Sequence, residues 1–131
     1  MSAADLNAAA SAVEDASAVL ARAIRHLAAA GPKALDENQA VAYDLAHAAS
    51  AVESARSMLD YGAKGDVEGR LACGFVADAV HDLATKLLGR EDQWGVERGA
   101  LDGALDFVRP HRDPATDAGD RRRVSGGERD A

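Results

Sequence analysis

A heptad repeat within residues 6–30 limits the possible folds more than any other feature of the chain. A large apolar residue recurs at every seventh position, and an alanine follows three residues after each one. The large residues are Leu6, Val13, Leu20 and Leu27, and the alanines are Ala9, Ala16, Ala23 and Ala30. This spacing places both sets on one helix face, and alanine there lets a neighbouring backbone approach closely. The repeat therefore predicts a long helix over 3–30 that packs tightly against antiparallel neighbours.

Three further segments show helical spacing of apolar residues and end at helix-stop signals. The predicted helices span residues 37–61, 67–88 and 96–108, and a connector spans 90–95. Gly31-Pro32 is expected to end the first helix, with Asp36 as the N-cap of the second. Pro110 is expected to end the last helix, because proline cannot continue the hydrogen-bond ladder.

The composition agrees with a helical fold of one domain. Aromatic residues make up only 4% of the 131 residues, too few for a typical sandwich or barrel. We therefore predict an all-α fold, an up-down four-helix bundle over residues 1–110. Residues 111–131 contain almost no large apolar side chain, so this segment is expected to be a disordered tail.

The charge and the cysteine content indicate the setting of the protein. A net charge of −7 disfavours nucleic acid and anionic membranes as partners, since both are themselves negative. The single cysteine, Cys73, cannot form an intrachain disulfide, and the chain has neither a signal-peptide pattern nor a membrane-length apolar run. We expect a soluble, cytoplasmic protein.

The sharpest chemical pattern is an Asp-x-x-His step in each of the two middle helices. The residues are Asp44 with His47 and Asp78 with His81, and Glu14 and Glu97 lie on the other two helices. Carboxylate-x-x-His steps on two helices are typical of di-iron bundles. Here, however, aspartate is shorter than the usual glutamate, and both steps flank the buried stripes. We therefore expect solvated helix flanks and no metal site.

No nucleophile or phosphate-binding motif is recognisable. Helical spacing places no base beside Cys73, which is expected to be a buried structural thiol. His26 is expected to stabilise the negative end of the first helix dipole, and His111 to be exposed beyond Pro110. The residues thus predict no catalytic site.

Two segments resemble a known family. The first contains Leu45-Ala46, then Val52-Glu53-Ser54-Ala55-Arg56 and Leu59; the second contains Leu71-Ala72, Phe75–Val80 and Leu87-Leu88-Gly89. Both are similar to helices of the C-terminal four-helix domain of acyl-CoA dehydrogenases, and to the helical N-terminal extension of some members. The resemblance covers residues 37–97. The family's Gly-Gly-x-Gly turn, which approaches the flavin, is replaced here by the sequence Gly89–Gly95, and the segment with the glutamate base is not recognisable.

The resemblance implies a non-catalytic interaction subunit that assembles with itself or with a catalytic flavin-dependent acyl-CoA dehydrogenase. We expect no turnover and no cofactor in the isolated chain, with FAD possible only across an interface with a partner. One alternative is a component of a flavin and acyl-CoA site in an oxidoreductase acting on CH–CH groups. Another is an unrelated metal- or ligand-binding bundle.

Leu71 and Phe75 are the candidate interface residues. The main apolar stripe of the third predicted helix consists of Ala72, Val76, Val80, Leu83 and Leu87. Leu71 and Phe75 lie off this stripe, so one bundle core need not bury both. Exposed together, they would form an apolar patch of the kind that marks an interface.

The alanine seam generates a first test. Replacing Ala16 with leucine is expected to overpack the seam and lower the free energy of unfolding by about 1–3 kcal/mol. Urea titration followed by circular dichroism measures the change. A neutral or stabilising effect would mean that Ala16 faces solvent.

Overall fold

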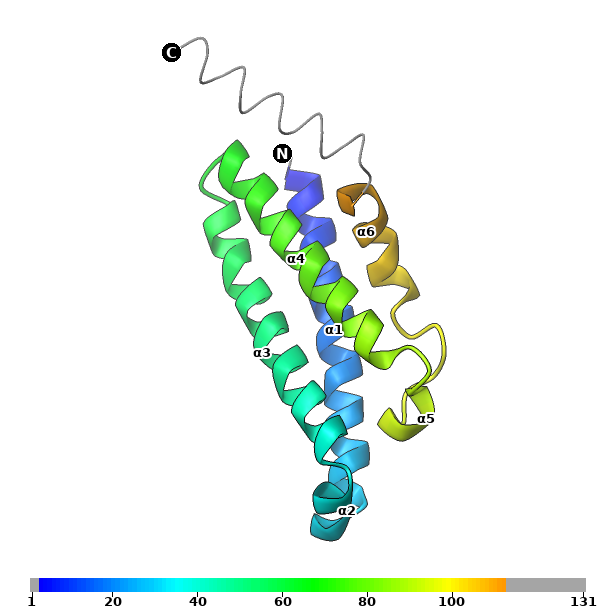
Figure 1. Cartoon of the computed structure of the whole chain (residues 1–131). Helices are drawn as coiled ribbons and strands as arrows, with labels where there is room; N and C mark the ends of the chain where they lie inside the picture. The colour runs from blue at the N-terminus through cyan, green and yellow to red at the C-terminus, as the bar shows by residue number, and fades with distance from the viewer. Residues whose placement is uncertain (1–2, 113–131) are drawn as a thin grey trace.

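The computed structural model describes residues 3–112, which contain helices and no strand. The elements are α1 (Ala3–Ala29), α2 (Pro32–Glu37), α3 (Gln39–Gly62), α4 (Asp66–Leu87), α5 (Glu91–Trp94) and α6 (Asp102–Arg112). Helices α1, α3, α4 and α6 run alternately down and up, with α2 at the lower end (Figure 1). The predicted all-α class is confirmed. None of these helices is both long and apolar enough to cross a membrane.

Helix α1 lies at the centre of the bundle and contacts each of the other five helices. Its seam residues Ala9, Ala16 and Ala23 are fully buried, while Ala30 beyond the helix end is exposed. The large heptad residues from Val13 to Leu27 are buried as well. The heptad prediction is therefore confirmed from Ala9 to Leu27.

Helices α3 and α4 form an antiparallel pair, and the predicted apolar stripe of α4, from Ala72 to Leu87, is buried. Near the turn that joins them, the two backbones approach each other at Gly62. A Cβ atom at this position would lie 2.7 Å from the Cβ of Ala72 and 3.0 Å from Cδ2 of Leu6. Glycine at position 62 is therefore needed for the close packing of α1, α3 and α4 at this end of the bundle.

The segment after α1 differs from the prediction. Gly31, with φ of 90°, ends α1 as expected, but Pro32 then begins the short helix α2. Proline suits the first helical position because its missing N–H would have no partner there. Asp36 lies inside α2, so the N-cap prediction for it is wrong, and Asn38 separates α2 from α3. The Nδ2 of Asn38 donates to the carbonyl oxygen of Ala34 at 2.8 Å.

The connector predicted over 90–95 contains α5, and the last helix begins at Asp102 rather than at residue 96. Gly95 and Gly99 have φ of 65° and 84°. A right-handed helix cannot contain this left-handed backbone, so residues 96–101 of the predicted helix are not helical. Trp94 of α5 is fully buried in the core. The segment 90–95, which the sequence assigned to a connector, thus contains the largest fully buried side chain.

Helix α6 continues through Pro110 to Arg112, so the predicted stop at Pro110 is wrong. The ring of His111 packs on Phe107 with centroids 4.3 Å apart, and its Nδ1 lies 2.9 Å from the Phe107 carbonyl oxygen. His111 is half-buried rather than exposed. These contacts stabilise the last turn of α6, although Pro110 has no N–H and leaves one hydrogen bond of the helix unmade. Residues 111 and 112, which the prediction assigned to the tail, belong to α6, and residues 113–131 lie outside the described part.

Two glycines provide a matched test of the packing. Gly62→Ala is expected to lower the free energy of unfolding by about 1–3 kcal/mol, because the new methyl group overlaps Ala72. Gly74→Ala, in the middle of α4 with nothing within 4 Å of the added Cβ, is expected to raise it by about 0.5–1 kcal/mol. Chemical denaturation of both variants measures the two changes. Equal effects of the same sign would contradict the close contact at Gly62.

Candidate functional site

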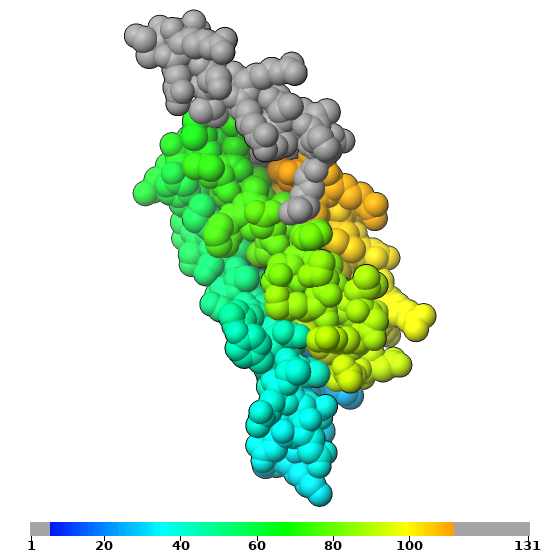
Figure 2. Space-filling view, in the orientation of Figure 1, coloured from blue at the N-terminus to red at the C-terminus, as the bar shows by residue number. Residues whose placement is uncertain are grey.

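Three large apolar side chains project from the outer face of α4. Val67, Leu71 and Phe75 are 48%, 54% and 41% exposed, and they follow one another in steps of four residues, which places them in one row. We call these three residues the α4 ridge. Helix α4 crosses the visible face of the molecule between α3 and α6 (Figure 2). Leu71 and Phe75 therefore lie off the core as their spacing predicts, and their role as an interface stays a prediction.

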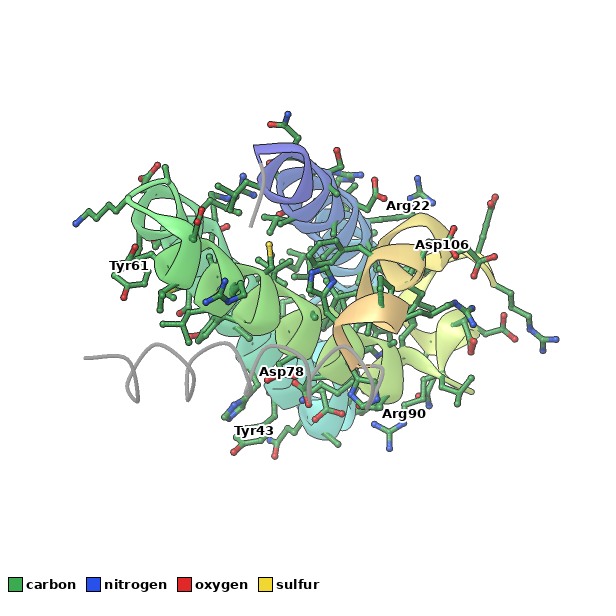
Figure 3. The ribbon with its side chains drawn as sticks, turned by 90° about the horizontal axis from the view of Figure 1, so that it is seen from above. Arg22, Tyr43, Tyr61, Asp78, Arg90 and Asp106 are labelled. Carbon is green, nitrogen blue, oxygen red and sulfur yellow. The ribbon has the colours of Figure 1, made fainter. Side chains whose placement is uncertain are left out.

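A cation lies before the ridge in the chain and a carboxylate after it. Lys64 precedes α4, and its Nζ lies 5.9 Å from the ring centroid of Tyr61. Asp78 follows Phe75 by three residues and points away from the bundle, as seen from above in Figure 3. The ridge is thus an apolar row with opposite charges beyond its two ends.

The Asp-x-x-His steps do not assemble into one site. Asp44 accepts a hydrogen bond from Arg90 at 2.8 Å, and the ring of His47 packs on Tyr43 at 4.3 Å between centroids. Within residues 3–112, no three His, Cys, Asp or Glu side chains are placed to hold a metal ion. His81 and Glu97 instead line a hollow at the lower end of α4.

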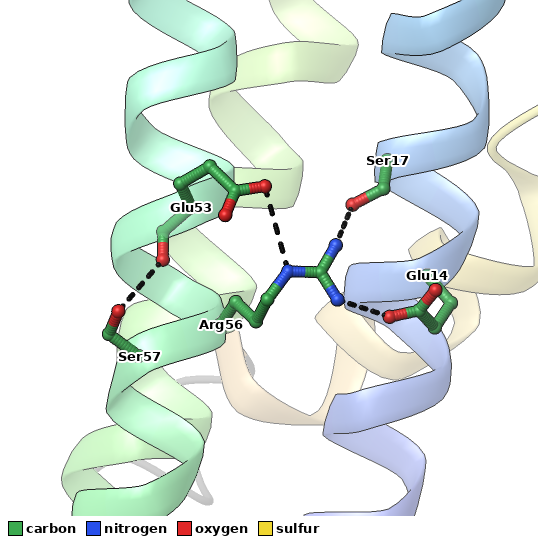
Figure 4. Close-up of polar contacts among 5 residues, drawn as sticks. All are labelled: Glu14, Ser17, Glu53, Arg56 and Ser57. Atoms are coloured by element: carbon green, nitrogen blue, oxygen red, sulfur yellow. Dashed lines mark hydrogen bonds and ion pairs between the residues drawn. The ribbon is translucent and has the colours of Figure 1, made fainter.

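Glu14 takes part in a polar network that joins α3 to α1. Arg56 donates to Oε1 of Glu14 at 2.5 Å and to Oγ of Ser17 at 2.6 Å, while its Nε lies 3.6 Å from Glu53 (Figure 4). The hydrogen bond to Glu14 raises the pKa of Arg56 above its usual range, so the guanidinium stays charged. Arg56 belongs to the family-like segment, and in this chain it links two helices at the surface.

Cys73 and His26 both contribute to the packing of the bundle. Cys73 is fully buried among the core residues of α4, in line with the expectation of an inert thiol. His26 lies in the last turn of α1, as its predicted effect on the helix dipole requires. Its ring also fills the space where a side chain at Gly95 would lie. His26 therefore packs α5 against α1, a contact that helical spacing alone does not reveal.

Comparisons with protein-family models, with curated proteins and with solved structures found no match to this chain. The similarity of residues 37–97 to acyl-CoA dehydrogenases consequently remains an expectation from the sequence.

Proposed function

We propose that the chain is a non-catalytic interaction subunit that assembles with a second copy of itself through the α4 ridge. The observation that carries the proposal is the exposure of Val67, Leu71 and Phe75 in one row. Transfer of these side chains from water into a contact would lower the free energy by about 25 cal/mol for every Å² of apolar surface covered. The bundle leaves 41–54% of each residue exposed, so a partner surface is the simplest way to bury them fully.

The spacing of the ridge suits an antiparallel pairing of α4 with α4 of the second copy. Rows of residues four apart pack into the grooves of a facing helix, and a two-fold axis repeats each contact. With the axis beside Leu71, position 67 of one copy comes opposite position 75 of the other. The end of the ridge that is followed by Asp78 in one copy then lies near the turn that carries Lys64 in the other copy, so that unlike charges flank the apolar contact. This complementarity favours a second copy over an unrelated apolar surface.

The assignment of the bundle to a particular family rests on the resemblance of residues 37–97 to acyl-CoA dehydrogenases. We propose that the fold is an up-down four-helix bundle related to the C-terminal domain of acyl-CoA dehydrogenases. Both family-like segments lie in α3 and α4, and the second includes Leu71 and Phe75 of the ridge. A flavin-dependent acyl-CoA dehydrogenase is therefore the second candidate partner for this surface. FAD would then be bound only across the interface with that partner.

A charge placed within the ridge tests the association. Phe75→Asp is expected to convert a dimer into a monomer, because a carboxylate in an apolar contact loses its hydration without gaining a partner. The molar mass is measured by size-exclusion chromatography with light scattering, and helix content and melting temperature by circular dichroism. Ile24→Asp is the matched control, since Ile24 of α1 is exposed to 49% and lies outside the ridge. The control is expected to keep the mass of the unchanged protein.

Three results would contradict the proposal. Unfolding by Phe75→Asp would place Phe75 in the core. A monomer at all concentrations of the unchanged protein would exclude self-association. Equal loss of mass in both variants would show that the ridge is not the contact.

A further inference from the structure

A hollow of about 310 Å³ opens at the lower end of α4, between its last two turns, residues 97–101 and the start of α6. Its floor is apolar and consists of Ala84, Leu87, Ala100, Leu101 and Leu105. Leu88 stands at the rim and is 81% exposed, more than any other large apolar residue that the structure describes. The volume lies at the lower end of the range typical of small-molecule sites.

The ionisable side chains that line this hollow are three carboxylates and one histidine. Glu91, Glu97 and Asp102 line the hollow together with His81 and Thr85, and in the described part of the chain no lysine or arginine does so. Glu91 is already engaged, because its carboxylate accepts the backbone N–H of Gly89 at 2.6 Å. Thr85 likewise donates to the carbonyl oxygen of Asp82 at 2.7 Å. The backbone carbonyl of Glu97 accepts the N–H of Ala100 at 3.2 Å, but its side chain is exposed and forms no hydrogen bond or ion pair within residues 3–112.

We propose that this hollow binds a small primary aliphatic amine in its protonated form. The alkyl chain would lie on the apolar floor and cover Leu88, and the ammonium group would donate to Glu97 and Asp102. An ammonium ion has three N–H donors and no acceptor, which matches a rim rich in carboxylate oxygens. A ligand with the same chain and a carboxylate head would meet like charges and be repelled. The proposal does not depend on the ridge, which lies in the first half of α4.

The test uses the ¹⁵N-labelled full chain and three probes of equal chain length: n-hexylammonium, n-hexanol and n-hexanoate. Hexylammonium is expected to shift the amide signals of Ala84, Leu88 and Ala100 in a saturable manner, with a dissociation constant on the order of millimolar. Hexanoate is expected to bind about tenfold more weakly, because attraction to the carboxylates is replaced by repulsion. Hexanol is expected to lie between the two.

Two pairs of variants locate the site. Glu97→Gln is expected to weaken hexylammonium binding about threefold, while Glu37→Gln on α2 leaves it unchanged. Leu88→Ser is expected to weaken it about threefold as well, while Leu35→Ser on α2 does not. All four side chains are exposed, so the fold is expected to persist in each variant. The absence of saturable shifts, equal binding of hexanoate, or equal effects within either pair would overturn the proposal.

Discussion

The close approach of other helices to α1 is the contact on which the rest of the structure depends. Alanine at 9, 16 and 23 leaves no side chain beyond Cβ between the helix backbones, so α3, α4 and α6 can all pack against one helix. Gly62 extends the same constraint to the top of α3, where even a methyl group would overlap Ala72. A core of small residues buries little apolar area for each contact. Close packing over a long interface compensates for this.

The outer face of α4 follows from that arrangement. Helices α1, α3 and α6 pack on one side of α4, and its opposite side carries exposed residues from Val67 near its start to Thr85 near its end. Polar residues occupy part of this side, and Asp82 and Lys86 form an ion pair there. Val67, Leu71 and Phe75 at one end, and Leu88 at the other, are the apolar exceptions. The proposed interface and the proposed amine site are thus two separate regions of the same helix.

The sequence predicts α1, α3 and α4 well because each carries a continuous apolar stripe with the helical period. It also predicts that Leu71 and Phe75 lie off the core, since both are rotated away from the stripe of α4. The region from Gly89 to Asp102 escapes prediction because its course depends on the left-handed glycines 95 and 99 and on Trp94. The amine site escapes it too, since its lining comes from α4, α5, residues 97–101 and α6. Only the folded chain brings these segments together.

The protein contains two phenylalanines, which allows the interface to be observed directly. Phe75 is 41% exposed on the ridge, whereas Phe107 is 8% exposed in the core. Both can be replaced by 4-fluorophenylalanine and followed by ¹⁹F NMR over a series of protein concentrations. Association through the ridge predicts that the Phe75 signal shifts or broadens as the concentration rises, while the Phe107 signal stays constant. A Phe75 signal that stays unchanged from dilute to concentrated solution would contradict it.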